Sequence, residues 1–182
     1  WNRSDFPDYE TMNKEISALE YGDTSGKLMN VTGRLAVQES FGWRTAVYIK
    51  ERWSDLDKKA LKDKLFEEQK NLLQCEDKNR EIDECVCELK RCMAAMPADK
   101  RASVYPYLIA ADGMRIFNSI GAVIIDFIQG KVDRDRNNML AGKLETWYYH
   151  YRRLWQTLSR ESELYRVSDV IFWYADYLRT MA

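Results

Sequence analysis

The sequence predicts an all-α protein, a helical bundle of about six to seven helices, three of them long. Apolar residues recur at alternating steps of three and four from Leu140 to Leu158 and, after a polar break at 159–163, again from Leu164 to Leu178, which places each run on one stripe of a helix. With 8 Gly and 3 Pro in 182 residues, the chain has few points at which helices must end. No segment alternates with the period of two that a strand requires.

Length and charge narrow the classes of protein to which the chain can belong. A length of 182 residues and a hydrophobic content of 46% suit one helical domain, 1–182, with a sizeable core. The 28 basic and 29 acidic side chains nearly cancel, so we expect neither nucleic acid nor an anionic membrane as a partner. Asp126 and Gln129 interrupt the longest apolar stretch, so no spanning helix is expected.

The N-terminal third predicts three short helices. Residues 1–7 should form an irregular leading segment, because a proline at position 7 disfavours helix for the residue before it. Glycine at position 22 suits a left-handed cap, and Asp23, Thr24 or Ser25 can cap the helix that follows. The expected helices are Asp8–Leu19, with Met12, Ile16 and Leu19 on one face, Lys27–Gln38 and Trp43–Trp53.

The central and C-terminal parts predict the longer helices. Ser54-Asp55 should cap a helical stretch that reaches Met96, with a kink or short turn in its highly charged part between Cys75 and Glu84. Pro97 ends this stretch. The remaining helices are expected at Val104–Gln129, capped by Ser103 and central to the bundle, from Asp133 or Asp135 through Leu158, and at Leu164–Thr180.

Four cysteines, Cys75, Cys85, Cys87 and Cys92, raise the question of a metal site. On a continuous helix Cys85 and Cys87 point to nearly opposite sides, so they cannot converge on one ion. We therefore expect no metal and no cofactor, and interpret the cysteines as reduced, partly buried thiols, which favours a soluble cytoplasmic protein. A bridge from Cys75 to Cys85 or Cys87 stays open if the helix breaks between them.

Three other titratable residues are catalytic candidates. His150 has no serine or cysteine at a spacing that indicates a triad. Asp112 and Asp126 lie in the most apolar predicted helix, where carboxylates need partners, and Arg115 is one helical step from Asp112. We interpret all three as structural or boundary groups, with acid–base work by the carboxylates as the alternative.

Tryptophan rings can bind sugars by stacking, and 6 Trp are present. Trp147 lies on the apolar stripe and Trp155 and Trp173 flank it, so these three are expected in the core. Trp1 and Trp43 lie near predicted loops, and they are the candidate carbohydrate-binding residues.

The C-terminal region resembles a known domain. The run Tyr151-Arg152-Arg153-Leu154-Trp155, the junction Ser162-Glu163-Leu164 and the final Leu178-Arg179 resemble the all-helical tail that follows the catalytic barrel in bacterial β-N-acetylhexosaminidase-like glycoside hydrolases. The closest likeness covers about forty C-terminal residues, with a looser one over the whole chain. The opening Trp1-Asn2 is similar to the exit of the final barrel strand in related sugar-cleaving enzymes.

The resemblance implies a non-catalytic accessory domain of a carbohydrate-active enzyme. The family's paired catalytic acids sit in the barrel, and no position here matches their motif. The implied partners are the barrel of the same parent chain, which the domain would pack on and stabilise, and the carbohydrate that the parent binds. The chain begins at Trp1 and not Met, so a fragment that follows a barrel is favoured over a processed mature protein.

Two other functions compete with this one. The first alternative is a free-standing bundle that binds a protein or peptide through an exposed aromatic groove, which a large apolar surface patch would favour. The second is a small helical enzyme that uses Asp112, Asp126 and His150.

Overall fold

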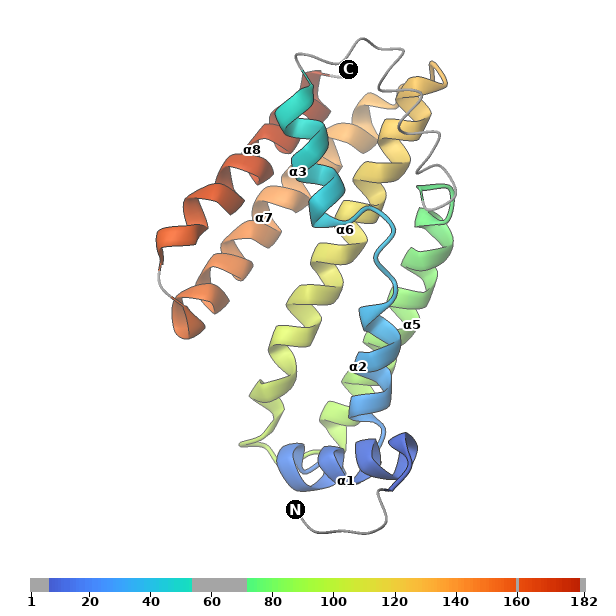
Figure 1. Cartoon of the computed structure of the whole chain (residues 1–182), viewed down its shortest axis with the longest axis vertical. Coiled ribbons are helices and arrows are strands. Elements are labelled where there is room, and N and C mark those ends of the chain that lie inside the picture. Colours follow the sequence, from blue (N-terminus) through green and yellow to red (C-terminus); the bar gives the residue numbers. More distant parts are fainter. Residues whose placement is uncertain (1–6, 54–71, 160, 181–182) are drawn as a thin grey trace. The chain divides into compact units, whose positions relative to one another are not determined.

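The computed structural model describes residues 7–53, 72–159 and 161–180, and in these ranges it contains helices and connecting turns but no strand. This confirms the all-α class (Figure 1). Among the residues described, the three longest helices are α5, α6 and α7, with 20, 24 and 25 residues. The elements in order are α1 (Tyr9–Tyr21), α2 (Leu28–Ala36), α3 (Trp43–Arg52), α5 (Cys75–Ala94), η1 (Arg101–Val104), α6 (Tyr105–Ile128), α7 (Arg134–Leu158), η2 (Glu161–Glu163) and α8 (Leu164–Thr180).

Contacts between Cα atoms divide the chain into two compact units. Unit 1 comprises Trp1–Gln38 and Glu81–Ala111, and unit 2 comprises Glu39–Arg80 and Asp112–Ala182. The boundaries fall inside α5 and inside α6, so each unit is assembled from segments that are distant in sequence. The organisation of 1–182 as one domain stays a prediction.

In unit 1, α1 packs on α2 through polar side chains. The side-chain amide of Asn13 donates to Asn30 at 2.6 Å, and the hydroxyl of the buried Ser17 accepts from the backbone N–H of Met29 at 3.0 Å. Leu19 is 80% exposed, so the expectation that it shares a packed face with Met12 and Ile16 is wrong. The reason is that the contact face of α1 is centred on Ser17, to one side of the apolar stripe.

A buried carboxylate fixes the turn between α1 and α2. Gly22 adopts a left-handed φ of 65°, as predicted, and the chain then turns so that Asp23 lies fully buried at the start of α2. One carboxylate oxygen accepts from the N–H groups of Lys27 and Leu28, both at 2.9 Å, and the other from the N–H and hydroxyl of Ser25. Burial opposes ionisation, but these hydrogen bonds outweigh it and lower the pKa of Asp23.

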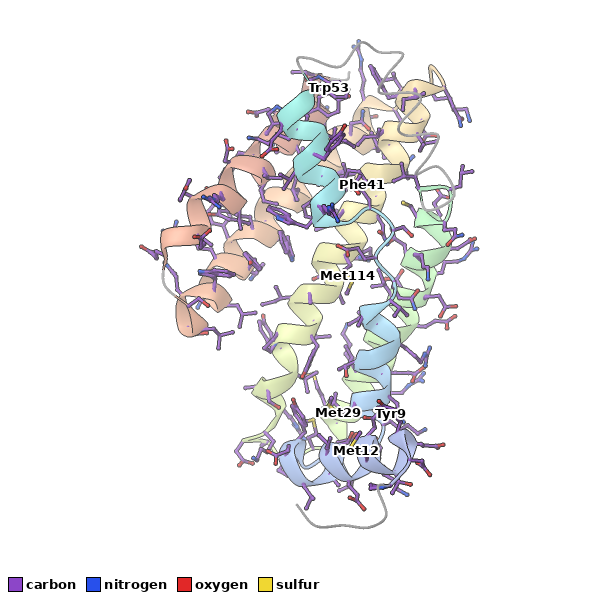
Figure 2. The ribbon with its side chains drawn as sticks, viewed as in Figure 1. Tyr9, Met12, Met29, Phe41, Trp53 and Met114 are labelled. Atoms are coloured by element: carbon purple, nitrogen blue, oxygen red, sulfur yellow. The ribbon has the colours of Figure 1, made fainter. Side chains whose placement is uncertain are left out.

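The core of unit 2 is centred on Tyr174 of α8. This side chain is fully buried, and its hydroxyl donates to the carbonyl of Ala46 at 2.8 Å, which joins α8 to α3. The rings of Phe41 and Phe117 lie 6.0 and 6.4 Å from the ring of Tyr174. Phe41, in the segment that leads into α3, is labelled in Figure 2. Other buried members of this core are Ile49, Leu72, Ile120, Ile124, Leu140, Leu144, Ile171 and Leu178.

Helices α7 and α8 form an antiparallel pair that agrees well with the predicted stripe (Figure 1). Asp133 caps α7 by accepting from the N–H of Arg136, and α8 has the predicted bounds. Leu158 is the exception, because it is 73% exposed at the last turn of α7, where the helix has run past the packed part of α8. The carboxylate of Glu145 receives two hydrogen bonds from Arg179, which hold the far end of the pair.

A buried amide network anchors the segment between α2 and α3. The side-chain oxygen of Asn118, on α6, accepts from the N–H groups of Ser40 and Phe41 at 2.8 and 3.1 Å. Its amide nitrogen donates to Asn79, whose own nitrogen donates to the Ser119 hydroxyl. Gly121 leaves room for this segment, since a Cβ there would lie 2.8 Å from the Cβ of Phe41.

Two boundary predictions are wrong. The kink or turn expected between Cys75 and Glu84 is absent, because α5 is continuous from Cys75 onward and its buried residues keep a regular seven-residue spacing through the charged part. The turn lies before the helix, at Leu73 and Gln74. Ser103 does not cap α6, because its hydroxyl donates to the carbonyl of Lys100 within η1. The predicted cap at Ser54-Asp55 lies outside the described residues.

By length and composition alone, the helical stretch Arg101–Ile128 could cross a membrane. The expectation of no spanning helix considered only uninterrupted apolar runs and therefore missed this stretch. In the structure 56% of its most apolar window is buried, as is usual for the central helix of a bundle.

Candidate functional site

Trp43, the first residue of α3, lies at the surface of unit 2, near a loop as expected. Its ring meets Phe117 edge to face at 6.0 Å and is 39% exposed. Gly42 is the extended residue before the helix, and a carboxylate oxygen of Glu39 accepts from the N–H of Trp43 at 3.3 Å. Carbohydrate binding by Trp43 stays a prediction, and Trp1 lies outside the described residues.

The other tryptophan rings of unit 2 pack against its core. Trp147 stacks on Tyr151 with ring centroids 5.1 Å apart, and its indole lies so close to α6 that a Cβ at Gly113 would be 2.6 Å from it. Trp173 lies parallel to Tyr177 at 5.1 Å. Trp147, Trp155 and Trp173 are half-buried against the core, which agrees with their predicted packing role.

The two acidic candidates, Asp112 and Asp126, lie far apart on α6 and each pairs with an arginine. Asp112 pairs with Arg115 at 3.3 Å and Asp126 with Arg136 at 2.8 Å, and both carboxylates are more than a third exposed. Fourteen residues separate the two on α6, which corresponds to about 21 Å along a helix axis. This separation places the two carboxylates out of reach of one substrate atom. His150 is exposed on α7.

All four cysteines are free thiols. Cys75, Cys85 and Cys92 are buried and Cys87 is exposed. Burial raises the pKa of Cys75 to about 12 and raises that of Cys85 and Cys92, so these thiols stay protonated. Within the described ranges no three His, Cys, Asp or Glu side chains are grouped as metal ligands would be.

A polar pocket that the sequence analysis did not single out lies at the turn between α6 and α7, drawn in gold at the upper right of Figure 1. The turn is a Schellman motif. Gly130 has a φ of 77°, its N–H donates to the carbonyl of Phe127, and the N–H of Lys131 donates to that of Asp126. Asp133 then caps α7. The whole segment belongs to unit 2.

The pocket has a cavity volume of about 110 Å³ and is partly open to solvent. Its apolar walls are Val123, Phe127 and Val132, and its polar lining is Asp126, Lys131, Asp133, Arg136 and Asn137. The ion pair between Arg136 and Asp126 spans the turn and ties α7 to α6.

Asn137 is the polar residue that the sequence analysis missed here. It is 97% buried, since only 3% of its surface is exposed, and it lines the pocket. Its spacing could have predicted that it is buried, because Asn137 lies three residues before Leu140 and seven before Leu144. It therefore extends the apolar stripe of α7 by one polar position.

The comparisons with known proteins give no relative. No protein-family model matches the chain, and no curated protein and no solved structure is significantly similar to it.

Proposed function

We propose that this chain is a non-catalytic helical domain of a carbohydrate-active enzyme, a glycoside hydrolase of the bacterial β-N-acetylhexosaminidase-like kind, that packs on and stabilises the catalytic barrel of its parent. The observation that carries the proposal is the resemblance of the C-terminal helices. In the structure the residues of that likeness make packing contacts: Leu164 and Leu178 are buried, and Trp155 lies against the core.

The arrangement of the reactive side chains supports a non-catalytic role. Asp112, Asp126 and Glu145 each pair with an arginine, and the buried thiols have raised pKa values. Carboxylates that pair with arginine and thiols that stay protonated are better suited to stabilising the fold than to transferring protons.

An exposed aromatic face on the α7–α8 pair supports packing against another domain. Tyr148 is buried between the two helices, and its ring meets Tyr149 at 6.1 Å and Phe172 at 5.5 Å. Tyr149 is 58% exposed and Phe172 39%. Tyr165, two helical turns before Phe172, is also exposed. We define Tyr149, Tyr165 and Phe172 as the outer aromatic face, and large exposed aromatics of this kind mark interaction surfaces.

The same face favours a second candidate function, a free-standing bundle that binds another protein. The two candidates differ in where the partner is encoded. The accessory-domain function requires a barrel-sized coding region directly upstream of Trp1. A start codon just before Trp1 would exclude that function.

The test compares the isolated chain with the product of the complete reading frame on a panel of chromogenic glycosides. We expect hydrolysis by the parent and none by the 182-residue chain. Deleting the chain from the parent should leave kcat/KM of the surviving enzyme nearly unchanged and shorten its half-life on heating. Turnover by the isolated chain that is lost in the variants Asp126→Asn or His150→Ala would contradict the proposal and support the helical-enzyme alternative.

A further inference from the structure

We propose that the exposed apolar side of α1 is a docking surface for a basic amphipathic helix of a partner protein. The surface lies within unit 1, and the inference goes beyond the proposed function because it requires neither a barrel nor a carbohydrate. We define the α1 stripe as Tyr9, Met12, Ile16 and Leu19. These residues follow one another at steps of three and four, so they share one side of the helix.

The first observation is that α1 leaves its apolar side unpacked. Among its 13 residues, all of which the structure describes, Ser17 alone is buried. Tyr9 and Leu19, at the two ends of the α1 stripe, are 81% and 80% exposed. Met12 and Ile16 between them are half-buried, and Figure 2 labels Tyr9 and Met12 on this helix. Apolar side chains at this spacing form the face that a helix usually buries, so the α1 stripe is a packing surface without a partner in unit 1.

The second observation is the charge beside the α1 stripe. Glu15 precedes Leu19 by four residues and Glu20 follows Ile16 by four, which places the two carboxylates on opposite edges of the stripe. Within the described ranges neither carboxylate forms an ion pair, since Lys100 donates to the backbone carbonyl of Glu20 and not to its side chain. Helix α1 carries three glutamates and one lysine, so it is negative although the whole chain is nearly neutral. Acids on both edges of an apolar stripe complement lysine or arginine on both edges of a partner's apolar face.

Charge and length together select this occupant over two others. An anionic membrane attracts helices whose polar side is rich in lysine and arginine, and the glutamates of α1 oppose such binding. A second copy packed stripe to stripe would bring Glu15 and Glu20 of the two chains together, which repulsion between like charges disfavours. The distance along the helix axis from Tyr9 to Leu19 is about 15 Å, or nearly three turns, which matches the i, i+3 and i+7 anchors of a docked helix.

The test is the fluorescence anisotropy of two labelled helical peptides of about 15 residues, each titrated with the complete 182-residue chain. Both peptides carry leucine at positions i, i+3, i+4 and i+7, and the leucines are flanked by lysine in the first peptide and by glutamate in the second. We expect the lysine peptide to bind with a dissociation constant of about 10–100 µM and the glutamate peptide to bind at least about tenfold more weakly.

Variants at exposed positions separate the α1 stripe from the rest of the surface. Leu19→Ala should weaken binding of the lysine peptide about three- to tenfold. Leu158→Ala, at a leucine of α7 that is 73% exposed, is the matched control and should bind like the native chain. Glu15→Lys should weaken binding of the lysine peptide about tenfold and strengthen that of the glutamate peptide. Glu84→Lys, at an exposed position of α5, is its control and should change either affinity by less than about twofold.

Three results would overturn the inference. One is that the lysine peptide shows no change in anisotropy at about 500 µM chain, well above the expected dissociation constant. Another is that Leu158→Ala weakens binding as much as Leu19→Ala, or that the glutamate peptide binds as tightly as the lysine peptide. The third is self-association of the chain, or its binding to phosphatidylserine vesicles, that Leu19→Ala abolishes, which would assign the α1 stripe to a second copy or to a membrane.

Discussion

Replacing Asn118 with alanine should lower the free energy of unfolding of unit 2 by about 3 kcal/mol, because two backbone N–H groups would lose their acceptor. Asn118 is fully buried, and its oxygen receives the N–H groups of Ser40 and Phe41. A buried donor left without a partner costs about 1–3 kcal/mol. Phe41 is fully buried and Ser40 only partly, so we assign about 2 and about 1 kcal/mol to them. A loss of this size is a large fraction of a typical stability of about 5–15 kcal/mol.

The assay is urea unfolding followed by tryptophan fluorescence, which reports mainly on unit 2 because five of the 6 Trp lie in its segments. Asn138→Ala, at an exposed position of α7, is the matched control and should change stability by less than about 0.5 kcal/mol. A loss below about 1 kcal/mol for Asn118→Ala would refute the reasoning, since the two N–H groups would then have found other acceptors at little cost.

Three further predictions concern glycines, pH and thiols. Gly121→Ala should destabilise unit 2 by about 1–3 kcal/mol, because the new Cβ would collide with Phe41. Gly142→Ala has open space around it and should stabilise α7 by about 0.5–1 kcal/mol. Midpoints of urea unfolding that move in the same direction for both variants would contradict this prediction. Asp23→Asn should lower the melting temperature at pH 7 and have a smaller effect at pH 2. The folded state lowers the pKa of this carboxyl below its unfolded pKa of 3.8, so the carboxylate stabilises the fold fully above that pKa. The contribution is lost as the pH falls through the folded pKa. A constant difference between the two melting curves across this pH range would count against the role given to Asp23. In the native protein only Cys87 of the four cysteines should react rapidly with a disulfide reagent, because the other three thiols are buried and have raised pKa values. Rapid reaction of two or more thiols would contradict the burial of Cys75, Cys85 and Cys92.

The sequence predicted the helices best where caps and apolar spacing agree. Asp133 was one of two expected caps for α7, and the stripe through Leu140, Leu144, Ile171 and Tyr174 is buried as expected. The bounds of α8 agree for the same reason. Both signals are local, so they do not depend on which segments meet in space.

The errors arise where tertiary contacts decide. Leu19 is apolar and correctly spaced, but α1 turns Asn13 and Ser17 toward α2, where their side chains form two hydrogen bonds with that helix. The network of Asn118 joins residues that are nearly eighty positions apart, and no local pattern marks it. The polar pocket likewise depends on how one turn folds back on α6, so its residues cannot be grouped from spacing alone.

The measurement that tests the central proposal most directly is hydroxyl-radical footprinting of the chain alone and within its parent. If the chain packs on a catalytic barrel through the outer aromatic face, Tyr149, Tyr165 and Phe172 should be oxidised readily in the isolated chain and several-fold more slowly in the parent. Tyr174, buried in both, is the internal control and should be oxidised slowly throughout. Equal oxidation of the three exposed rings in the two proteins would contradict the proposal that this face is covered by the barrel.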